Sequence, residues 1–183
     1  MKSTGYYLGL LSPPISPVRA ALFAAALGLW FPMESAASVH TWSGAGANGL
    51  WSTAANWSGG APAAGEADAR LVFPAGANRL SNTNNIDNLA VTTITLSGTG
   101  YRLAGTGNGT NLVVKTVVLS NGPVAATITS SGVNNMFLSS LDLVLGAGPD
   151  TVTFNVADAT DVLRIEGSMS GPGGFKKIGR AHV

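Results

Sequence analysis

Short aliphatic runs that each end in a turn recur along the second half of the chain, and they set the expected architecture. Corresponding positions in four runs are Leu96, Leu119, Leu145 and Ile165, which follow one another in steps of 23, 26 and 20 along the numbering. A second mark, an Asn or Asp followed by an apolar residue, recurs at positions 85, 111, 135 and 161, in steps of 26, 24 and 26. A shared period of this length is typical of repeat proteins, so we predict a β-strand solenoid.

Within the runs, apolar and polar residues alternate with the period of two that marks a half-buried strand. Leu141, Leu143 and Leu145 share one face, whereas Asp142 and Val144 share the other, and 151–156 alternates in the same way. The aliphatic side chains are therefore expected to stack inside and the Thr, Ser and charged side chains to face outward. Stacked strands would also place the amides of Asn85, Asn111 and Asn135 in a ladder.

Composition fits stacked strands and excludes several partners. Charged residues make up 10% of the chain and Gly numbers 24, which favours strands joined by turns. Between Ser38 and Phe175 there are five basic and eight acidic residues, 5 − 8 = −3. This balance gives no basic surface for nucleic acid or an anionic membrane. The absence of cysteine excludes disulfides and thiolate metal sites.

The first 37 residues have the layout of a secretory signal peptide. Lys2 and Arg19 precede an apolar run over 20–33, and the small residues 35–37 follow, which places cleavage near Ala37. A membrane-spanning helix needs about 20 apolar residues, and this run has 14. We therefore expect an exported protein that meets the membrane only during export or through a missing C-terminal anchor.

Residues 38–80 form a segment of different character, rich in Trp, Gly and Asn. Trp42, Trp51 and Trp57 lie close together in it, separated by Gly and Asn turns. A solenoid ends in an exposed apolar cross-section and an unpaired sheet edge, which terminal residues must cover. We predict that 38–80 is an N-terminal cap and that 81–177 forms about three to four coils.

The sequence of this segment resembles that of a known family. Trp42-Ser-Gly, Trp51-Ser-Thr-Ala-Ala-Asn-Trp57, Gly60-Ala-Pro62 and Leu71-Val-Phe-Pro74 look like the opening of secreted bacterial proteins that carry autotransporter-associated β-strand repeats. Residues 165–179 are similar to the repeat itself, with Lys177 and Gly179 matching, but Phe175 and Ile178 departing from it. The resemblance implies an all-β, right-handed parallel β-helix at the cell surface or outer membrane, or released from the cell, and it implies no catalytic residues.

The last six residues, 178–183, break the repeat pattern. We interpret them as a non-native tail, which would make the chain the N-terminal part of a longer protein.

Motifs that could carry chemistry are better explained by turns. Residues 44–49 match G-x-G-x-x-G without the strand and helix that a dinucleotide site requires. Residues 146–153 resemble a single calcium-binding nonapeptide, which cannot complete a coordination shell. The acids at 142, 150, 158, 161 and 166 are expected to lie in solvated turns rather than as a glycosidase pair. His40 has no triad or metal partner, and we predict a surface position for it.

Two functions of different class follow. The first is a non-catalytic structural segment for surface display, without enzyme activity, cofactor or metal, whose partners are unknown and could be surface glycans or other cells. The alternative is a carbohydrate-binding or polysaccharide-cleaving β-helix module in which Trp42, Trp51 or Trp57 stacks on sugar rings.

Overall fold

The fold is taken from a computed structural model, which describes residues 37–106, 115–119, 125–146, 151–157 and 160–179. The chain divides into two compact units, 1–36 and 37–183, and all the described residues belong to the second. The signal-peptide prediction therefore lies almost entirely outside the described residues, as does Asn111. No helix in the described ranges combines the length and apolarity that crossing a membrane requires.

The described chain is all-β, as the alternating pattern predicts, and its one helical element is the three-residue 3-10 helix η1 (Ala54–Asn56). The strands are short because a Gly, Asn or Ser turn interrupts the chain every few residues. They are β1 (Val39–Trp42), β2 (Trp57–Ser58), β3 (Ala69–Phe73), β4 (Ser81–Asn84), β5 (Leu89–Leu96), β6 (Arg102–Gly105), β7 (Lys115–Leu119), β8 (Thr127–Ser130), β9 (Asn135–Phe137), β10 (Leu141–Leu145), β11 (Val152–Val156), β12 (Leu163–Ile165), β13 (Met169–Ser170) and β14 (Phe175–Gly179).

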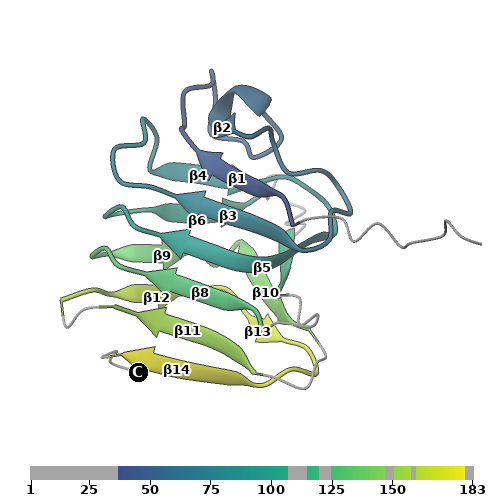
Figure 1. Cartoon of the computed structure of the whole chain (residues 1–183), viewed down its shortest axis with the longest axis vertical. Coiled ribbons are helices and arrows are strands. Elements are labelled where there is room, and N and C mark those ends of the chain that lie inside the picture. The colour runs from purple at the N-terminus through teal and green to yellow at the C-terminus, as the bar shows by residue number, and fades with distance from the viewer. Residues whose placement is uncertain (1–36, 107–114, 120–124, 147–150, 158–159, 180–183) are drawn as a thin grey trace, which may run out of the picture. The chain divides into compact units, whose positions relative to one another are not determined.

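The strands pair in parallel in three rows, which Figure 1 shows stacked one strand above the next. One row runs β1, β3, β5, β8, β11, β14. A second row runs β4, β6, β9, β12 as a separate sheet. The third runs β5, β7, β10, β13. Consecutive strands along the chain mostly belong to different rows. Each strand therefore pairs with strands of its own row, most of which are separated from it in the sequence by strands of the other rows. Among the described strands, only β1 and β2 pair antiparallel.

Strand β5 belongs to two rows and joins them. Leu89 to Val91 pair with β7, whereas Thr93 to Leu96 pair with β8. The register against β3 shifts at this point, leaving Thr92 as the extra residue of a bulge. A bulge bends a strand, and here it turns the chain from one row into the next.

The core lies between the rows and is built by the predicted alternation. Leu141, Leu143 and Leu145 are buried while Asp142 and Val144 are half-buried. The same alternation holds in β11, where Val152, Phe154 and Val156 point inward. In both strands the sequence pattern identified the inward face correctly.

The predicted equivalence of the four aliphatic marks is correct for only one pair. Leu119 and Leu145 are direct partners. Leu96 instead pairs with Ser130, and Ile165 pairs with Phe137 in the other sheet. The four aliphatic residues lie in different rows because strands of all three rows contain similar aliphatic sequences.

The predicted amide ladder is wrong for the two described members. The side chain of Asn85 is bonded to Ser52 at the surface, with Nδ2 to Oγ at 2.7 Å. Asn135 is buried, and its Oδ1 accepts from the backbone N–H of Tyr101 at 2.9 Å. The two amides occupy different positions and serve different turns.

The strand register also runs through both predicted segment boundaries. Strand β3, inside the predicted cap, pairs over its whole length with β5. At the other end, Ile178 and Gly179 continue β14 and pair with Asn155 and Val156. These two residues of the proposed tail therefore follow the strand pattern, and 180–183 lie outside the described residues.

Candidate functional site

The three tryptophans of the opening segment form one aromatic cluster with Phe73 inside the core. Trp42 and Trp51 are fully buried, and Trp57 is 6% exposed. The ring of Trp57 lies edge-on to both, with centroids 5.0 Å from Trp42 and 6.0 Å from Trp51. Phe73 contacts all three at 5.8 to 6.2 Å. Edge-to-face geometry is the favoured arrangement for packed rings.

Each indole N–H of the cluster has a hydrogen-bond acceptor. Trp42 Nε1 donates to the carbonyl oxygen of Arg79, Trp51 Nε1 to Asn82 Oδ1 and Trp57 Nε1 to the carbonyl oxygen of Trp51, each at 2.7 Å. Burying an indole without a partner would cost free energy, so these bonds allow the rings to sit in the core. They also tie the opening segment to the residues around β4.

Asn56 organises the loop between β1 and β2. Its Oδ1 accepts from the backbone N–H of Gly46 at 2.8 Å, and its Nδ2 donates to the carbonyl oxygens of Asn48 and Leu50, both at 2.9 Å. The side chain is fully buried. One amide thus replaces the backbone pairing that a loop of this length lacks. The G-x-G-x-x-G match at 44–49 lies in this loop and is followed by the single turn η1 and then β2, not by the long helix of a dinucleotide site.

The same opening segment covers the first strand of each row. Strand β2 pairs with the free edge of β1, with Thr41 opposite Ser58 and Trp42 opposite Trp57. On β4, Leu50 bridges to Thr83, whose N–H donates to the carbonyl oxygen of Gly49 at 2.8 Å.

The third row is covered by residues 65–66. The N–H of Gly65 donates to the carbonyl oxygen of Asp87 at 3.0 Å, and the N–H of Ala90 donates to that of Glu66 at 2.9 Å. All three starting edges therefore have backbone partners within 38–80. Unpaired edges are templates for association, and this end of the stack presents none among its described strands.

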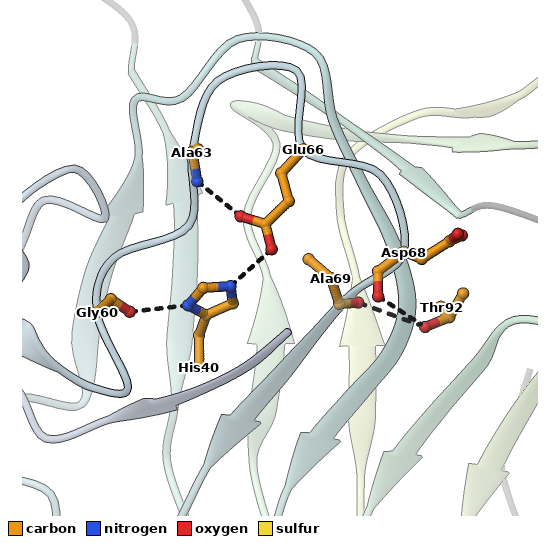
Figure 2. A network of polar contacts seen from close by, with 7 residues as sticks. All are labelled: His40, Gly60, Ala63, Glu66, Asp68, Ala69 and Thr92. Atoms are coloured by element: carbon orange, nitrogen blue, oxygen red, sulfur yellow. Dashed lines mark hydrogen bonds and ion pairs between the residues drawn. The ribbon is translucent and has the colours of Figure 1, made fainter. Parts of the chain in front are cut away.

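His40 fastens the loop over 60–66 to β1, as Figure 2 shows. Its Nδ1 lies 2.8 Å from the carbonyl oxygen of Gly60, and its Nε2 lies 2.8 Å from Glu66 Oε1. The other carboxylate oxygen of Glu66 accepts from the N–H of Ala63 at 2.8 Å. Both ring nitrogens face oxygen acceptors, so forming both bonds requires a proton on each nitrogen.

The surface position predicted for His40 is wrong, because the residue is only 4% exposed. It lies two residues before Trp42 in β1 and therefore points to the same, inward face. Around Glu66, burial acts to raise the carboxyl pKa, but the hydrogen bonds from His40 and Ala63 and the charge of His40 lower the pKa below its ordinary value of 4.5.

The opposite end of the stack differs from this capped end. Strands β12, β13 and β14 each pair on one side only within the described residues. Four large apolar side chains there are well exposed: Val162 at 51%, Met169 at 42%, Phe175 at 56% and Ile178 at 43%. Within the described residues this end therefore leaves the outer edges of its last strands unpaired, whereas the first strand of each row has a backbone partner.

The acidic residues that the structure describes are not gathered into one site. Asp142 lies in β10 and accepts from the N–H of Ser168 at 2.8 Å, and Glu166 pairs with Arg164 at 3.1 Å on the surface. Asp161 is buried, with 8% of its surface exposed, which differs from the solvated turn predicted for it. Asp150 and Asp158 lie outside the described residues, as do 147–150 of the calcium-like motif. The described residues contain no group of three His, Asp or Glu placed to bind a metal ion.

No protein-family model, curated protein or solved structure matches this chain. The candidate site therefore stands on its own geometry: a capping segment, defined as residues 38–66, built around three buried indoles. Sequence reasoning located the tryptophans but missed Asn56, Asn82 and Glu66. The inward position of Asn82 could have been read from the alternation in β4, where Asn82 and Asn84 share the buried face.

Proposed function

We propose that the chain is a non-catalytic structural segment of an exported, surface-displayed β-strand-repeat protein, in which the three rows form a right-handed parallel β-helix. The autotransporter-like resemblance of the opening residues supports this proposal. One observation carries it: every row is covered at its first strand, whereas its last described strand has a free side.

Where the strand edges are paired at one end of the stack and unpaired at the other, further strands can add only at the unpaired end. The capping segment occupies the N–H and C=O groups of β1, β4 and the first residues of β5, so further strands cannot add there. Within the described residues, no strand pairs with the outer side of β12, β13 or β14, each of which runs parallel to its one neighbour. Length, rather than turnover, is what such an architecture supplies.

Association in solution tests the difference between the two ends. Phe175→Lys places a charge on the open edge, and Val39→Lys places one at the capped end, where Val39 is comparably exposed at 50%. We expect self-association, measured by light scattering, to fall in Phe175→Lys and to stay unchanged in Val39→Lys. Equal behaviour of the two variants would contradict the proposal.

Export is tested separately by expressing the full chain with a C-terminal reporter in a bacterial host. The proposal expects cleavage near Ala37, found by mass spectrometry, and a reporter accessible to external protease. A chain that keeps residues 1–37 and remains in the cytoplasm would contradict it.

The carbohydrate-binding alternative receives no support from the aromatic geometry. A sugar stacks on an exposed ring face, and Trp42, Trp51 and Trp57 are all in the core with their N–H groups bonded. A sugar-stacking role would require these rings to leave the core.

A further inference from the structure

His40 is held between two oxygen acceptors at a place that solvent barely reaches. Its side chain is 5% exposed, and that of its partner Glu66 is 15% exposed. Figure 2 shows the imidazole ring between the carbonyl oxygen of Gly60 and the carboxylate of Glu66, each 2.8 Å from one ring nitrogen. At this distance no water lies between the ring and either oxygen. Both contacts are therefore hydrogen bonds only when His40 carries both ring protons.

Loss of one ring proton turns one of these two contacts into a repulsion. If Nε2 keeps its proton, the lone pair of Nδ1 faces the carbonyl oxygen of Gly60. If Nδ1 keeps its proton, the lone pair of Nε2 faces the carboxylate of Glu66, which also loses the cation beside it. Histidine is the side chain whose charge ordinarily changes between about pH 5 and pH 8. The geometry around His40 therefore depends on pH in this range.

Glu66 is the charged side chain that contacts His40, and the strands beside His40 present an aromatic and an apolar group. Strand β2 contributes the ring of Trp57, which lies edge-on with its centroid 6.2 Å from that of His40. Strand β3 places Leu71 opposite His40. Three further charged residues of the neighbouring elements lie on the outward face of β3 or in the turns before β3 and β5: Arg70, Asp68 and Asp87. The charge of His40 is thus coupled most directly to that of Glu66.

The loop over 60–66 is what covers the first residues of β5, at the start of the third row. The N–H of Gly65 donates to the carbonyl oxygen of Asp87 at 3.0 Å, and the N–H of Ala90 donates to that of Glu66 at 2.9 Å. These two backbone bonds form only while the loop lies against the edge of β5. They therefore report directly whether the loop is closed.

The two bonds of His40 fasten this loop at both of its ends, at Gly60 and at Glu66. The backbone at Gly60 and Gly65 has φ values of +87° and +73°, and a Cβ at either position would meet nothing within 4 Å. Glycine in open space changes its backbone conformation at little cost. These two positions allow the loop to change its path once a bond to His40 is lost.

We propose that His40 is a pH-dependent clasp for the capping segment. With both ring protons it holds the 60–66 loop over the first residues of β5, and with only one it releases the loop. The starting edge of the third row is then closed at lower pH and open at higher pH. The clasp lies at the capped end and does not depend on export or on the free side of the last strands, so it can fail while the proposed function stands.

Amide hydrogen exchange of the full chain tests this proposal through the N–H groups of Gly65 and Ala90. Protection factors, which correct for the intrinsic pH dependence of exchange, are measured by NMR between about pH 5 and pH 8. We expect the factors of Gly65 and Ala90 to fall about tenfold over this range, because a charge-assisted hydrogen bond is lost. The N–H of Thr83 donates to Gly49 in the covering of the second row at 2.8 Å and serves as the internal control, whose factor should stay constant.

Glu66→Gln distinguishes a clasp from a merely structural contact. The Gln amide donates through Nε2 and accepts through Oε1, so a neutral His40 can keep both of its bonds in this variant. We therefore expect the fall with pH to disappear in Glu66→Gln, as it should in His40→Gln, which has no ring to titrate. His182→Gln removes the other histidine of the chain and should behave as the wild type. Far-UV circular dichroism checks the folding of each variant.

Protection of Gly65 and Ala90 that does not change with pH in the wild type would overturn the proposal. So would a fall of the wild-type size in Glu66→Gln or in His40→Gln, because the titrating group would then lie elsewhere. An equal fall at Thr83 would overturn it as well, since the whole capping segment would then open rather than the 60–66 loop.

Discussion

Trp51 and Asn82, which lie 31 positions apart in the sequence, are joined by a buried hydrogen bond from the indole Nε1 to the amide Oδ1 at 2.7 Å. Trp51 is fully buried and Asn82 is 2% exposed. The bond links the capping segment to β4 at the start of the second row, so the opening residues are part of the folded core and not an appended loop.

Replacing Trp51 by Phe keeps an aromatic ring but leaves the Asn82 oxygen without its donor. A buried acceptor without a partner costs about 1–3 kcal/mol of stability, and we expect a loss in the free energy of unfolding in that range in urea titrations. The double variant Trp51→Phe/Asn82→Leu removes both polar groups and should recover part of the loss. A double variant whose loss equals the sum of the two single losses would show that the bond is not formed.

Glu66 is expected to make the capping segment sensitive to acid. Its folded pKa lies below 4.5, so the carboxylate stabilises the fold above the unfolded pKa, and this contribution disappears as the pH falls through the folded value. The difference in unfolding free energy between the wild type and Glu66→Gln should therefore be largest near neutral pH. It should shrink as the pH is lowered below 4.5. A difference that stays constant with pH would exclude an ionised Glu66 from the contact with His40.

Gly44 is required by the close approach of the capping segment to Arg79. Its φ is +62°, and a Cβ there would lie 2.6 Å from the backbone nitrogen of Arg79. Gly65 has a similar φ of +73° but open space around it. Ala at either position incurs the left-handed backbone penalty of about 1 kcal/mol, and only Gly44→Ala adds a clash. Thermal unfolding should show a clearly larger loss for Gly44→Ala than for Gly65→Ala, and equal losses would argue against the close approach.

Tyr101 is expected to limit stability at alkaline pH. Its hydroxyl donates to the carbonyl oxygen of Pro74 at 2.6 Å, and burial raises the pKa of the phenol from 10.0 to about 12. A raised folded pKa means that the stabilisation is complete below pH 10.0 and is lost as the pH rises toward 12.

Tyr101→Phe removes both the bond and the ionisation. It should cost about 1 kcal/mol near neutral pH, and its disadvantage should shrink between pH 10.0 and 12. Circular dichroism across that range measures the effect. If the disadvantage instead grew with pH, the assignment of a neutral, bonded phenol would be wrong.

The alternation within single strands could be read from the sequence, because burial on one face imposes a period of two regardless of what the strand pairs with. The leucines of β10 illustrate this. The pairing between strands could not be read in the same way. Leu96 and Leu119 end similar aliphatic runs, yet Leu96 does not pair with Leu119. It pairs with Ser130, which follows Leu119 in the sequence and lies in the row that β5 shares with β8. Turns of unequal length separate the rows, and hydrophobic pattern alone does not say which row a run joins.

In the candidate site, the gathering of the three tryptophans could be read from the sequence, because they lie close together in one turn-rich segment. Their polar partners could not. Asn56, Asn82 and Glu66 are individually ordinary residues, and their roles arise from contacts with residues up to 31 positions away. The lack of a triad or metal partner predicts a surface position for His40, whereas its spacing of two residues from Trp42 indicates the inward face.

Disulfide formation between engineered cysteines tests the stacked register most directly, because the chain has no cysteine of its own. Thr95 and Thr129 are direct partners in adjacent parallel strands, at a separation that a disulfide can bridge. The sequence period alone would instead align Thr95 with Val118. Our account predicts rapid, nearly complete oxidation of the Thr95→Cys/Thr129→Cys variant and none within the monomer for Thr95→Cys/Val118→Cys. The reverse result would contradict it.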